Sequence, residues 1–171
     1  MTKFLVMIIS LMLLTAAPAQ AKEAADSAAF KNAVLGFAEP DARVERLAKF
    51  LASYDSPLTP YAPDFVAAAD QYGLDWQLVP AITGVESTFG KHIPGNSYNA
   101  YGWANGAYRF TSWPQSIDHV TRVLAEKYVG RGLDTPGKIG PVYAPPSSTW
   151  AVKVAFFINQ LDNLKALELT L

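Results

Sequence analysis

Residues 78–90 read LVPAITGVESTFG, an apolar run that leads into an acidic residue. Four of its side chains look core-facing: Leu78, Val79, Ile82 and Val85. The run predicts a buried helix from about Asp75 through Glu86. Pro80 lies inside it and lacks an N–H group, so we expect the helix to be kinked or to start late. Glu86 would then lie where the core meets the surface.

The expected position of Glu86 bears on its protonation. A carboxyl that is partly withdrawn from water has a raised pKa and stays protonated near neutral pH, the state that a general acid needs. A single Glu at the end of a helix more often faces water. The apolar run alone leaves both interpretations open.

Two helices are predicted before this run, over residues 40–54 and 64–73. The first carries apolar residues at the spacing of one helical face, and Asp41 is its expected N-cap. A proline-rich stretch then ends it, because proline cannot continue a helix. Asp64 is the expected cap of the second helix, and Gly73 its expected terminator.

Two more helices are predicted later in the chain, over residues 114–130 and 149–167. Each places apolar side chains on one face at helical spacing. The first buries Ile117, Val120, Leu124 and Tyr128, and the second buries Trp150, Val154, Phe157, Leu161 and Leu164.

Residues 90–112 differ from the rest of the chain, since they are rich in Gly, Asn, Tyr, Trp and Pro and show no helical period. This composition predicts an irregular lobe, with room for one short β-hairpin. The chain shows no internal repeat and no strand-rich region. The predicted fold is therefore mostly α, a helical domain with a small irregular or β-hairpin lobe.

The N-terminus predicts export. Residues 1–21 combine a lysine, an apolar run and Ala-Gln-Ala, the pattern of a cleaved signal peptide. The run is short for a membrane span, although an uncleaved anchor is the alternative. Residues 22–40 are Ala-rich and predict a linker or a loosely docked helix, and residues 41–171 a single domain. We expect a monomer in the periplasm or outside the cell, with no stable membrane insertion after cleavage.

Composition excludes several classes of protein. The chain has no cysteine, so it offers no disulfide, thiol nucleophile or cysteine-based metal site. Its formal net charge is −1, which gives no bulk positive field for nucleic acid. His92 and His119 lie far apart without metal-binding spacing, so we expect no metal and no cofactor.

Several motifs in order resemble two families of the lysozyme-like superfamily, the bacterial glucosaminidases and the soluble lytic transglycosylases. An apolar helix ending in Glu-Ser, AITGVES, is followed by SYNAYGWANG, in which Asn99, Tyr101 and Gly102 match an Asn-x-aromatic-Gly stretch. RFTSWPQSI is similar to a turn that leads into a helix. Tyr143-Ala144, before the last helix, resembles a segment whose Tyr lies beside the catalytic acid. The resemblance covers roughly residues 64–161.

The resemblance implies a lysozyme-like fold and cleavage of peptidoglycan glycan strands. Glu86 would be the catalytic acid and Tyr143 its supporting residue, which would hydrogen-bond to Glu86 or to the substrate's acetamido group. Ser87 would either bind the sugar or only end the helix.

The acidic residues depart from the glucosaminidase pattern, because no Asp or Glu lies between Glu86 and Asp118. Asp118, Glu126 and Asp134 remain as candidates for a second carboxylate, although the first two are expected on a solvated helix face. A single-acid route, as in the lytic transglycosylases, is therefore favoured. A hydrolysing glucosaminidase or muramidase and a non-catalytic glycan-binding factor are the alternatives.

The irregular lobe holds five aromatic residues within sixteen positions: Tyr98, Tyr101, Trp103, Tyr108 and Trp113. Aromatic faces stack on the apolar faces of sugars, while amide side chains bind their hydroxyl groups, so this composition suits a glycan cleft. We expect Tyr101 and Trp103 to line the groove, Trp113 to pack in the lobe, and Asn99 and Asn105 to bind substrate.

Overall fold

The computed structural model describes residues 41–168 of the 171-residue chain, with side chains through Leu164. The predicted signal peptide and linker therefore lie outside the described residues. Within this range the chain forms six α-helices, three short 3-10 helices and no strand: α2 (Ala42–Ala52), η1 (Thr59–Tyr61), α3 (Ala62–Tyr72), α4 (Leu78–Ser87), η2 (Trp103–Gly106), α5 (Trp113–Lys127), η3 (Val129–Arg131), α6 (Pro136–Tyr143) and α7 (Trp150–Glu168). The mostly-α prediction is confirmed.

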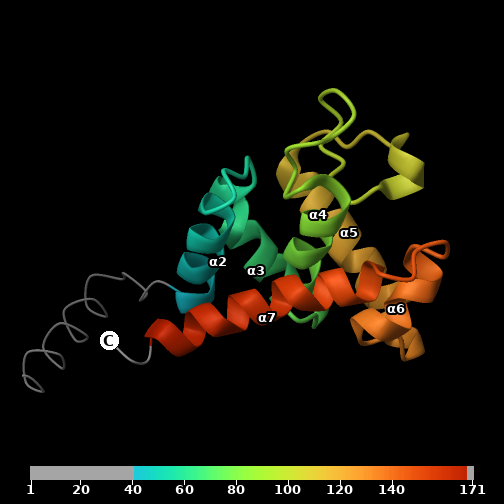
Figure 1. Ribbon diagram of the computed structural model, residues 1–171. Coiled ribbons are helices and arrows are strands. Elements are labelled where there is room, and N and C mark those ends of the chain that lie inside the picture. Colours follow the sequence, from blue (N-terminus) through green and yellow to red (C-terminus); the bar gives the residue numbers. More distant parts are fainter. Residues whose placement is uncertain (1–40, 169–171) are drawn as a thin grey trace, which may run out of the picture. The chain divides into compact units, whose positions relative to one another are not determined.

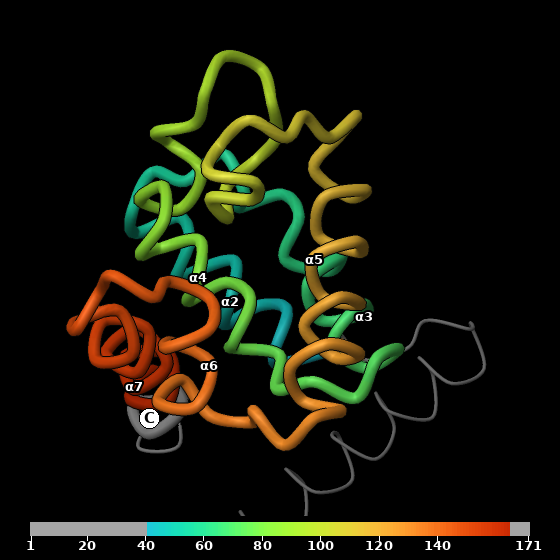
Figure 2. Tube along the Cα trace, turned by 90° about the vertical axis from the view of Figure 1, so that its right-hand side faces the viewer, coloured from blue at the N-terminus to red at the C-terminus, as the bar shows by residue number. Residues whose placement is uncertain are grey.

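The helices pack around α4 (Figure 1). α3 contacts both α2 and α5, and α7 contacts α4, α6 and α2. Figure 2 shows α5 and α7 on opposite sides of α4, with the irregular segment at one end of the bundle. None of the helices in the described part of the chain is both long and apolar enough to cross a membrane.

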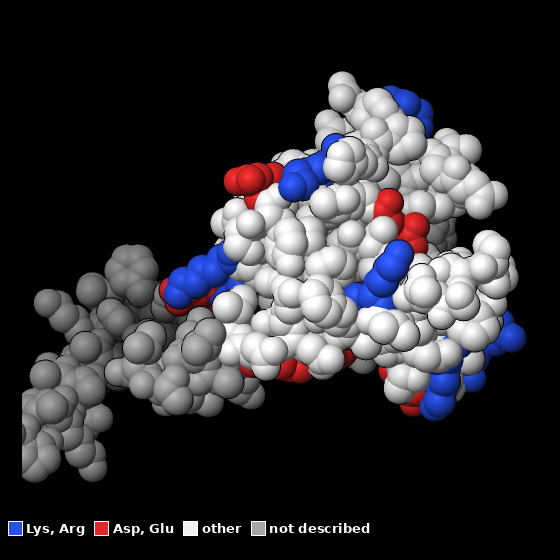
Figure 3. All heavy atoms as spheres, in the orientation of Figure 1, with Lys and Arg blue, Asp and Glu red and all other residues white. Residues whose placement is uncertain are grey.

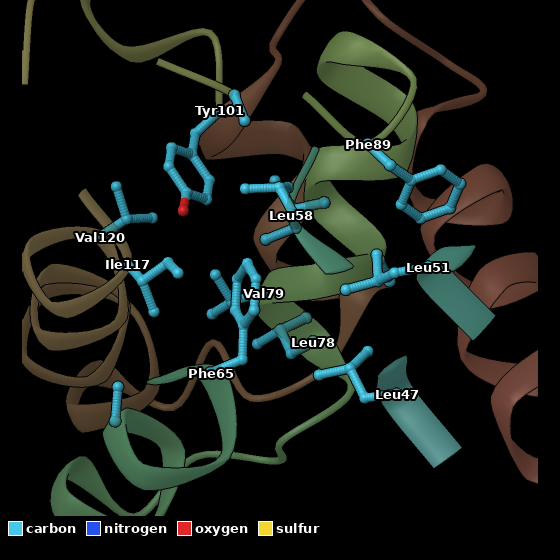
Figure 4. Close-up of a cluster of buried hydrophobic side chains, with 14 of the residues drawn as sticks. Leu47, Leu51, Leu58, Phe65, Leu78, Val79, Phe89, Tyr101, Ile117 and Val120 are labelled. Atoms are coloured by element: carbon cyan, nitrogen blue, oxygen red, sulfur yellow. The ribbon is translucent and has the colours of Figure 1, made fainter. Parts of the chain in front are cut away.

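One buried core joins α2, α3, α4 and α5 (Figure 4). Leu47 and Leu51 of α2, Ile82 of α4 and Ile117 of α5 are all inaccessible to solvent. Tyr101 comes from the irregular segment and points its ring into the same core. The segment is thus held to the helices by a large buried side chain.

Capping explains where the first two helices begin and end. The Asp41 carboxylate accepts the N–H of Arg43 at 2.9 Å, which confirms the predicted cap of α2. Asp64 is not the cap of α3, because the helix starts at Ala62 with Pro63 in its first turn, where a missing N–H costs nothing. Gly73 ends α3 as predicted, with φ of 68°.

The start of α4 is delayed, as its proline suggested. Asp75 accepts the N–H of Gln77 at 2.9 Å, and the helix itself begins at Leu78. Pro80 therefore lies in the first turn, where its N–H would have no helical partner. At the other end Thr88 adopts a left-handed conformation with φ of 51°, so the helix stops directly after the Glu86-Ser87 pair.

Helix α6 was not predicted, because Pro136–Tyr143 contains two prolines and two glycines. Thr135 caps it, and Pro136 occupies its first turn, where proline is favoured. A Cβ atom on Gly140 would lie 3.3 Å from the ring of Trp150. The small residues of α6 therefore allow close packing against the start of α7.

Residues 88–112 form turns, bends and the short helix η2. The sequence predicted either an irregular segment or a β-hairpin here. The segment is irregular and contains no hairpin. A backbone hydrogen bond from the N–H of Phe110 to the carbonyl of Ser97, 2.9 Å long, ties its two sides together. This irregular segment is called the lobe below.

Substituting Gly84 should destabilise the fold. A Cβ there would lie 2.6 Å from the ring of Phe89 and 2.9 Å from that of Phe157, and Phe89 is fully buried. We expect Gly84→Ala to lower the free energy of unfolding by about 1–3 kcal/mol through overpacking, measured by urea denaturation. Gly137→Ala is the matched control, because nothing lies within 4 Å of its added Cβ. Equal stability of the two variants would contradict the packing described for α4.

Candidate active site

The Glu86 side chain lies where three parts of the chain meet. It projects from the last turn of α4, and its Oε1 accepts a hydrogen bond from the indole Nε1 of Trp150 at 2.7 Å. Trp150 is the first residue of α7 and is 2% exposed. The bond therefore fixes the half-buried carboxyl between the end of one helix and the start of another.

The backbone of the lobe closes over the other oxygen of the same carboxyl. Gly102 has φ of 67°, and a Cβ built on it would lie only 2.7 Å from Oε2 of Glu86. A side chain at this position would collide with the carboxyl and strain the backbone. Gly102 is thus the residue that lets the lobe approach Glu86.

Two opposing effects act on the pKa of Glu86. Partial burial raises the pKa because it penalises the charged form, and the hydrogen bond from Trp150 lowers the pKa because it stabilises the carboxylate. Burial is the larger effect, so the pKa lies above its ordinary value. The apolar run alone left a raised pKa and a solvated carboxylate both open, and this environment favours the raised pKa.

A cavity of about 250 Å³ is lined by Gly102, the residue whose added Cβ would lie 2.7 Å from the Glu86 carboxyl. Its walls come from the lobe, the end of α5 and the end of α6: Tyr101, Gly102, Trp103, Ala104, Asn105, Tyr128 and Tyr143. None of these residues is acidic. Figure 3 shows the surface hollowed between the lobe and α6, with acidic atoms at the inner side of the hollow.

Tyr143 lies at the cavity but does not hydrogen-bond to Glu86. Its hydroxyl donates to the carbonyl of Tyr101 at 2.7 Å, and its ring stacks on Trp150 with centroids 5.0 Å apart. Burial, then the nearby Glu86 charge, raises the pKa of Tyr143 well above its ordinary range. The group that orients Glu86 is Trp150, and Tyr143 holds the lobe to α6.

Three of the predicted substrate-binding residues are buried, so their polar side-chain groups do not face the cavity. Ser87, Asn99 and Tyr101 are 3%, 2% and 0% exposed. The Ser87 hydroxyl donates to the carbonyl of Ala100 at 2.9 Å and accepts the N–H of Gly90 at 2.9 Å. These contacts favour the alternative in which Ser87 only ends the helix, since its hydroxyl is used inside the protein.

Asn99 and Tyr101 support the lobe from within. The Asn99 amide donates to the carbonyls of Trp103 and Tyr108, at 2.9 and 3.0 Å, and its oxygen accepts the N–H of Trp103 at 3.0 Å. The Tyr101 ring enters the core, where burial raises the pKa of its hydroxyl. Only the remaining two predicted residues, Trp103 and Asn105, both line the cavity and retain exposed surface.

The three candidates for a second carboxylate each interact with a partner side chain at the surface. Asp118 accepts the hydroxyl of Tyr72 at 2.7 Å. Glu126 lies 3.8 Å from Arg122, and Asp134 lies 2.8 Å from Lys138. Within the described residues no group of three His, Asp or Glu side chains could hold a metal ion.

Sequence reasoning missed three residues of this site. Trp150 was assigned only to the core face of α7, Gly102 was read only as part of a motif, and Tyr128 was assigned to a helix face. A usable signal was the glycine directly before Trp103, a residue that was expected to line the groove. The pairing of Trp150 with Glu86 spans 64 positions and left no local pattern.

No protein-family model and no curated protein matches this chain. The assignment of its chemistry therefore depends on the geometry around Glu86.

Glu86→Gln should change the pH dependence of stability. A raised folded-state pKa means that wild type loses stability as pH rises through that pKa, whereas a neutral Gln does not. We expect the variant to gain stability relative to wild type as the pH rises above about 4.3, the ordinary pKa of a glutamate, measured by urea unfolding. Glu45→Gln is the control: the Lys49 hydrogen bond lowers the pKa of Glu45, so its stability difference changes only below about pH 4.3, with the opposite sign, and stays constant above it. A Glu86→Gln difference that does not grow with pH would contradict the raised pKa.

Proposed function

We propose that this chain is an exported enzyme that cleaves the glycan strands of peptidoglycan with Glu86 as its single catalytic acid, as a lytic transglycosylase of lysozyme-like fold. The observation that carries the proposal is a half-buried carboxyl with a raised pKa, held by Trp150 beside an aromatic cavity without a second carboxylate. The proposal of export to the periplasm or the cell exterior rests on the signal-peptide pattern of residues 1–21.

The proposed reaction uses Glu86 twice. The protonated carboxyl gives its proton to the glycosidic oxygen as the bond between that oxygen and C1 breaks. The substrate's own acetamido group stabilises the positive charge that develops at C1. The Glu86 carboxylate then removes the proton of the 6-hydroxyl, whose oxygen bonds to C1, so an anhydro sugar forms and Glu86 regains its proton. No water is consumed.

The hydrogen bond from Trp150 suits this cycle. A residue that must donate and then accept a proton needs an environment in which neither form is strongly excluded. Burial favours the protonated form, and the indole N–H stabilises the carboxylate. Trp103 and Tyr143 offer ring faces for sugar stacking, and Asn105 offers an amide for a hydroxyl or acetamido group.

Two alternatives make different products. A hydrolysing glucosaminidase or muramidase with two carboxylates requires them about 5–9.5 Å apart across the sugar. A glycan-binding factor would use the cavity without turnover. The engagement of Asp118, Glu126 and Asp134 with partners at the surface supports the single-acid route over the hydrolase.

Glu86→Gln should abolish cleavage while preserving binding. Loss of the general acid is expected to slow digestion of purified peptidoglycan by about 10²–10⁴-fold. Wild type should release products with anhydromuramic ends, identified by mass spectrometry as one water lighter than hydrolytic ends. Glu126→Gln, on the exposed face of α5, is the matched control and should cleave normally. Hydrated ends would identify a hydrolase, and sacculus binding without turnover in wild type would identify a binding factor.

Trp150→Phe should move the pH profile of cleavage. The change retains an aromatic ring but removes the N–H that lowers the pKa of Glu86, so that pKa rises. The alkaline limb of the rate profile is therefore expected at higher pH than in wild type. Trp76→Phe, in which the lost indole packs on Arg46 instead, controls for loss of a tryptophan. An unchanged limb in Trp150→Phe would mean that Trp150 does not act on the catalytic proton.

A further inference from the structure

His119 of α5 lies among aromatic side chains of the lobe. Its ring centroid is 5.7 Å from that of Trp103 and 6.0 Å from that of Tyr108. The Phe110 ring lies at 5.6 Å. Figure 2 shows the lobe at the end of the bundle where α5 begins. One half-buried side chain of α5 therefore contacts three rings of the lobe.

Trp103 connects this cluster to the candidate active site. It lines the cavity together with Gly102, the residue that lets the lobe approach Glu86. The Asn99 side chain accepts the Trp103 N–H at 3.0 Å and donates to the Trp103 carbonyl at 2.9 Å. His119 contacts the ring of the same residue. Asn99 thus fixes the main chain of the cavity wall, and His119 fixes its aromatic side chain.

The cavity wall after Trp103 has an uncommon backbone. Ala104 and Asn105 line the cavity with φ of 51° and 55°, in the left-handed region that favours glycine. Residues other than glycine occupy that region at a cost in free energy and hold it only where their surroundings fix the chain. The contacts of Trp103 with Asn99 and His119 are such surroundings. Loss of the His119 contact is therefore expected to loosen the wall.

The aromatic rings are the partners that the structure gives the imidazole. Within residues 41–164 the His119 ring forms no hydrogen bond and no ion pair. Charged groups of α5, α4 and the lobe are directed elsewhere: Asp118 to Tyr72, Arg122 to Glu126, Glu86 to Trp150, Lys91 to the Tyr54 carbonyl, and Arg109 towards Gly95. The contact between His119 and the lobe therefore depends on how the imidazole interacts with aromatic faces.

Protonation changes that interaction. Histidine gains its charge as the pH falls from about 8 to about 5. A cation within about 6 Å of a ring centroid is attracted to the negative face of the ring, most strongly for tryptophan. The three lobe rings all lie within that distance of the imidazole. The lobe therefore holds the imidazolium more firmly than the neutral imidazole, and rising pH weakens the contact.

We propose that His119 positions the aromatic wall of the cavity and that its charge makes the firmness of this wall depend on pH. At low pH the imidazolium holds Trp103 against α5, and the wall loosens as the proton is lost. His119 is a positioning residue, since it acts through Trp103 and does not itself line the cavity. The consequence for cleavage rests on the proposed function, whereas the wall itself can be tested without substrate.

The first test is hydrogen exchange of the Trp103 amide, which is bonded to Asn99 and reports local opening of the wall. The full chain is used as Glu86→Gln, so that the titration of Glu86 does not contribute. Protection is expressed relative to an unfolded peptide at the same pH. We expect it to fall about two- to five-fold between about pH 5 and pH 8, the range of an exposed cation–π contact.

Three further variants of this chain assign the effect to His119. His119→Phe keeps a ring without a charge, and His119→Gln keeps neither ring nor charge, so protection should not depend on pH in either one. His92→Gln removes the other histidine of the chain, which is exposed, and should respond as the parent does. Protection that stays constant in the parent, that rises with pH, or that falls equally in His119→Phe would overturn the inference.

The second test separates this inference from the proposed function. Over the same pH range the KM of wild type for glycan strands should rise about two- to five-fold relative to that of His119→Phe, while kcat follows Glu86 in both. Equal KM values at every pH would overturn the positioning role. Cleavage without a pH-dependent wall would overturn the role of His119 and leave the enzyme intact. A pH-dependent wall in a chain that cleaves nothing would retain the role of His119 in the wall and overturn the enzyme.

Discussion

The hydrogen bond between the Trp150 indole and the Glu86 carboxyl is the contact on which the rest of the site depends. It joins the end of α4 to the start of α7, two segments separated by 64 residues. α6 packs on the same indole through Gly140 and Tyr143. The lobe reaches the carboxyl through Gly102 and is tied to α6 by the bond from Tyr143 to the Tyr101 carbonyl.

This arrangement decides what the carboxyl can do. Without a neighbouring cation or second carboxylate in the cavity walls, burial and one neutral donor set its pKa. Burial raises the pKa of Glu86, so the carboxyl ionises at a higher pH than usual. The indole N–H lowers the pKa, because it stabilises the carboxylate. A group in such surroundings exchanges a proton with a bound substrate more readily than a solvated surface carboxylate does.

Local patterns in the sequence were sufficient for most helices and for the acid itself. The Asp41 cap, the Gly73 terminator and the apolar run before Glu86 each depend on residues within a few positions of one another. Helix α6 was missed because its prolines and glycines oppose helix formation locally, and its packing on Trp150 compensates. Asn99 was taken for a sugar ligand, and Ser87 was left open as one, because their polarity is visible in the sequence, whereas their internal hydrogen bonds depend on how the lobe folds.

The central claim is that partial burial raises the pKa of Glu86 above that of an ordinary glutamate. The most direct measurement is a carbon-13 NMR titration of the Glu86 carboxyl in the full-length wild-type chain, assigned by comparison with Glu86→Gln. The account predicts a midpoint above that of an ordinary glutamate, since burial outweighs the bond from Trp150. A midpoint at or below the ordinary value would contradict the account, because Glu86 would then be an ionised surface residue without a proton to donate.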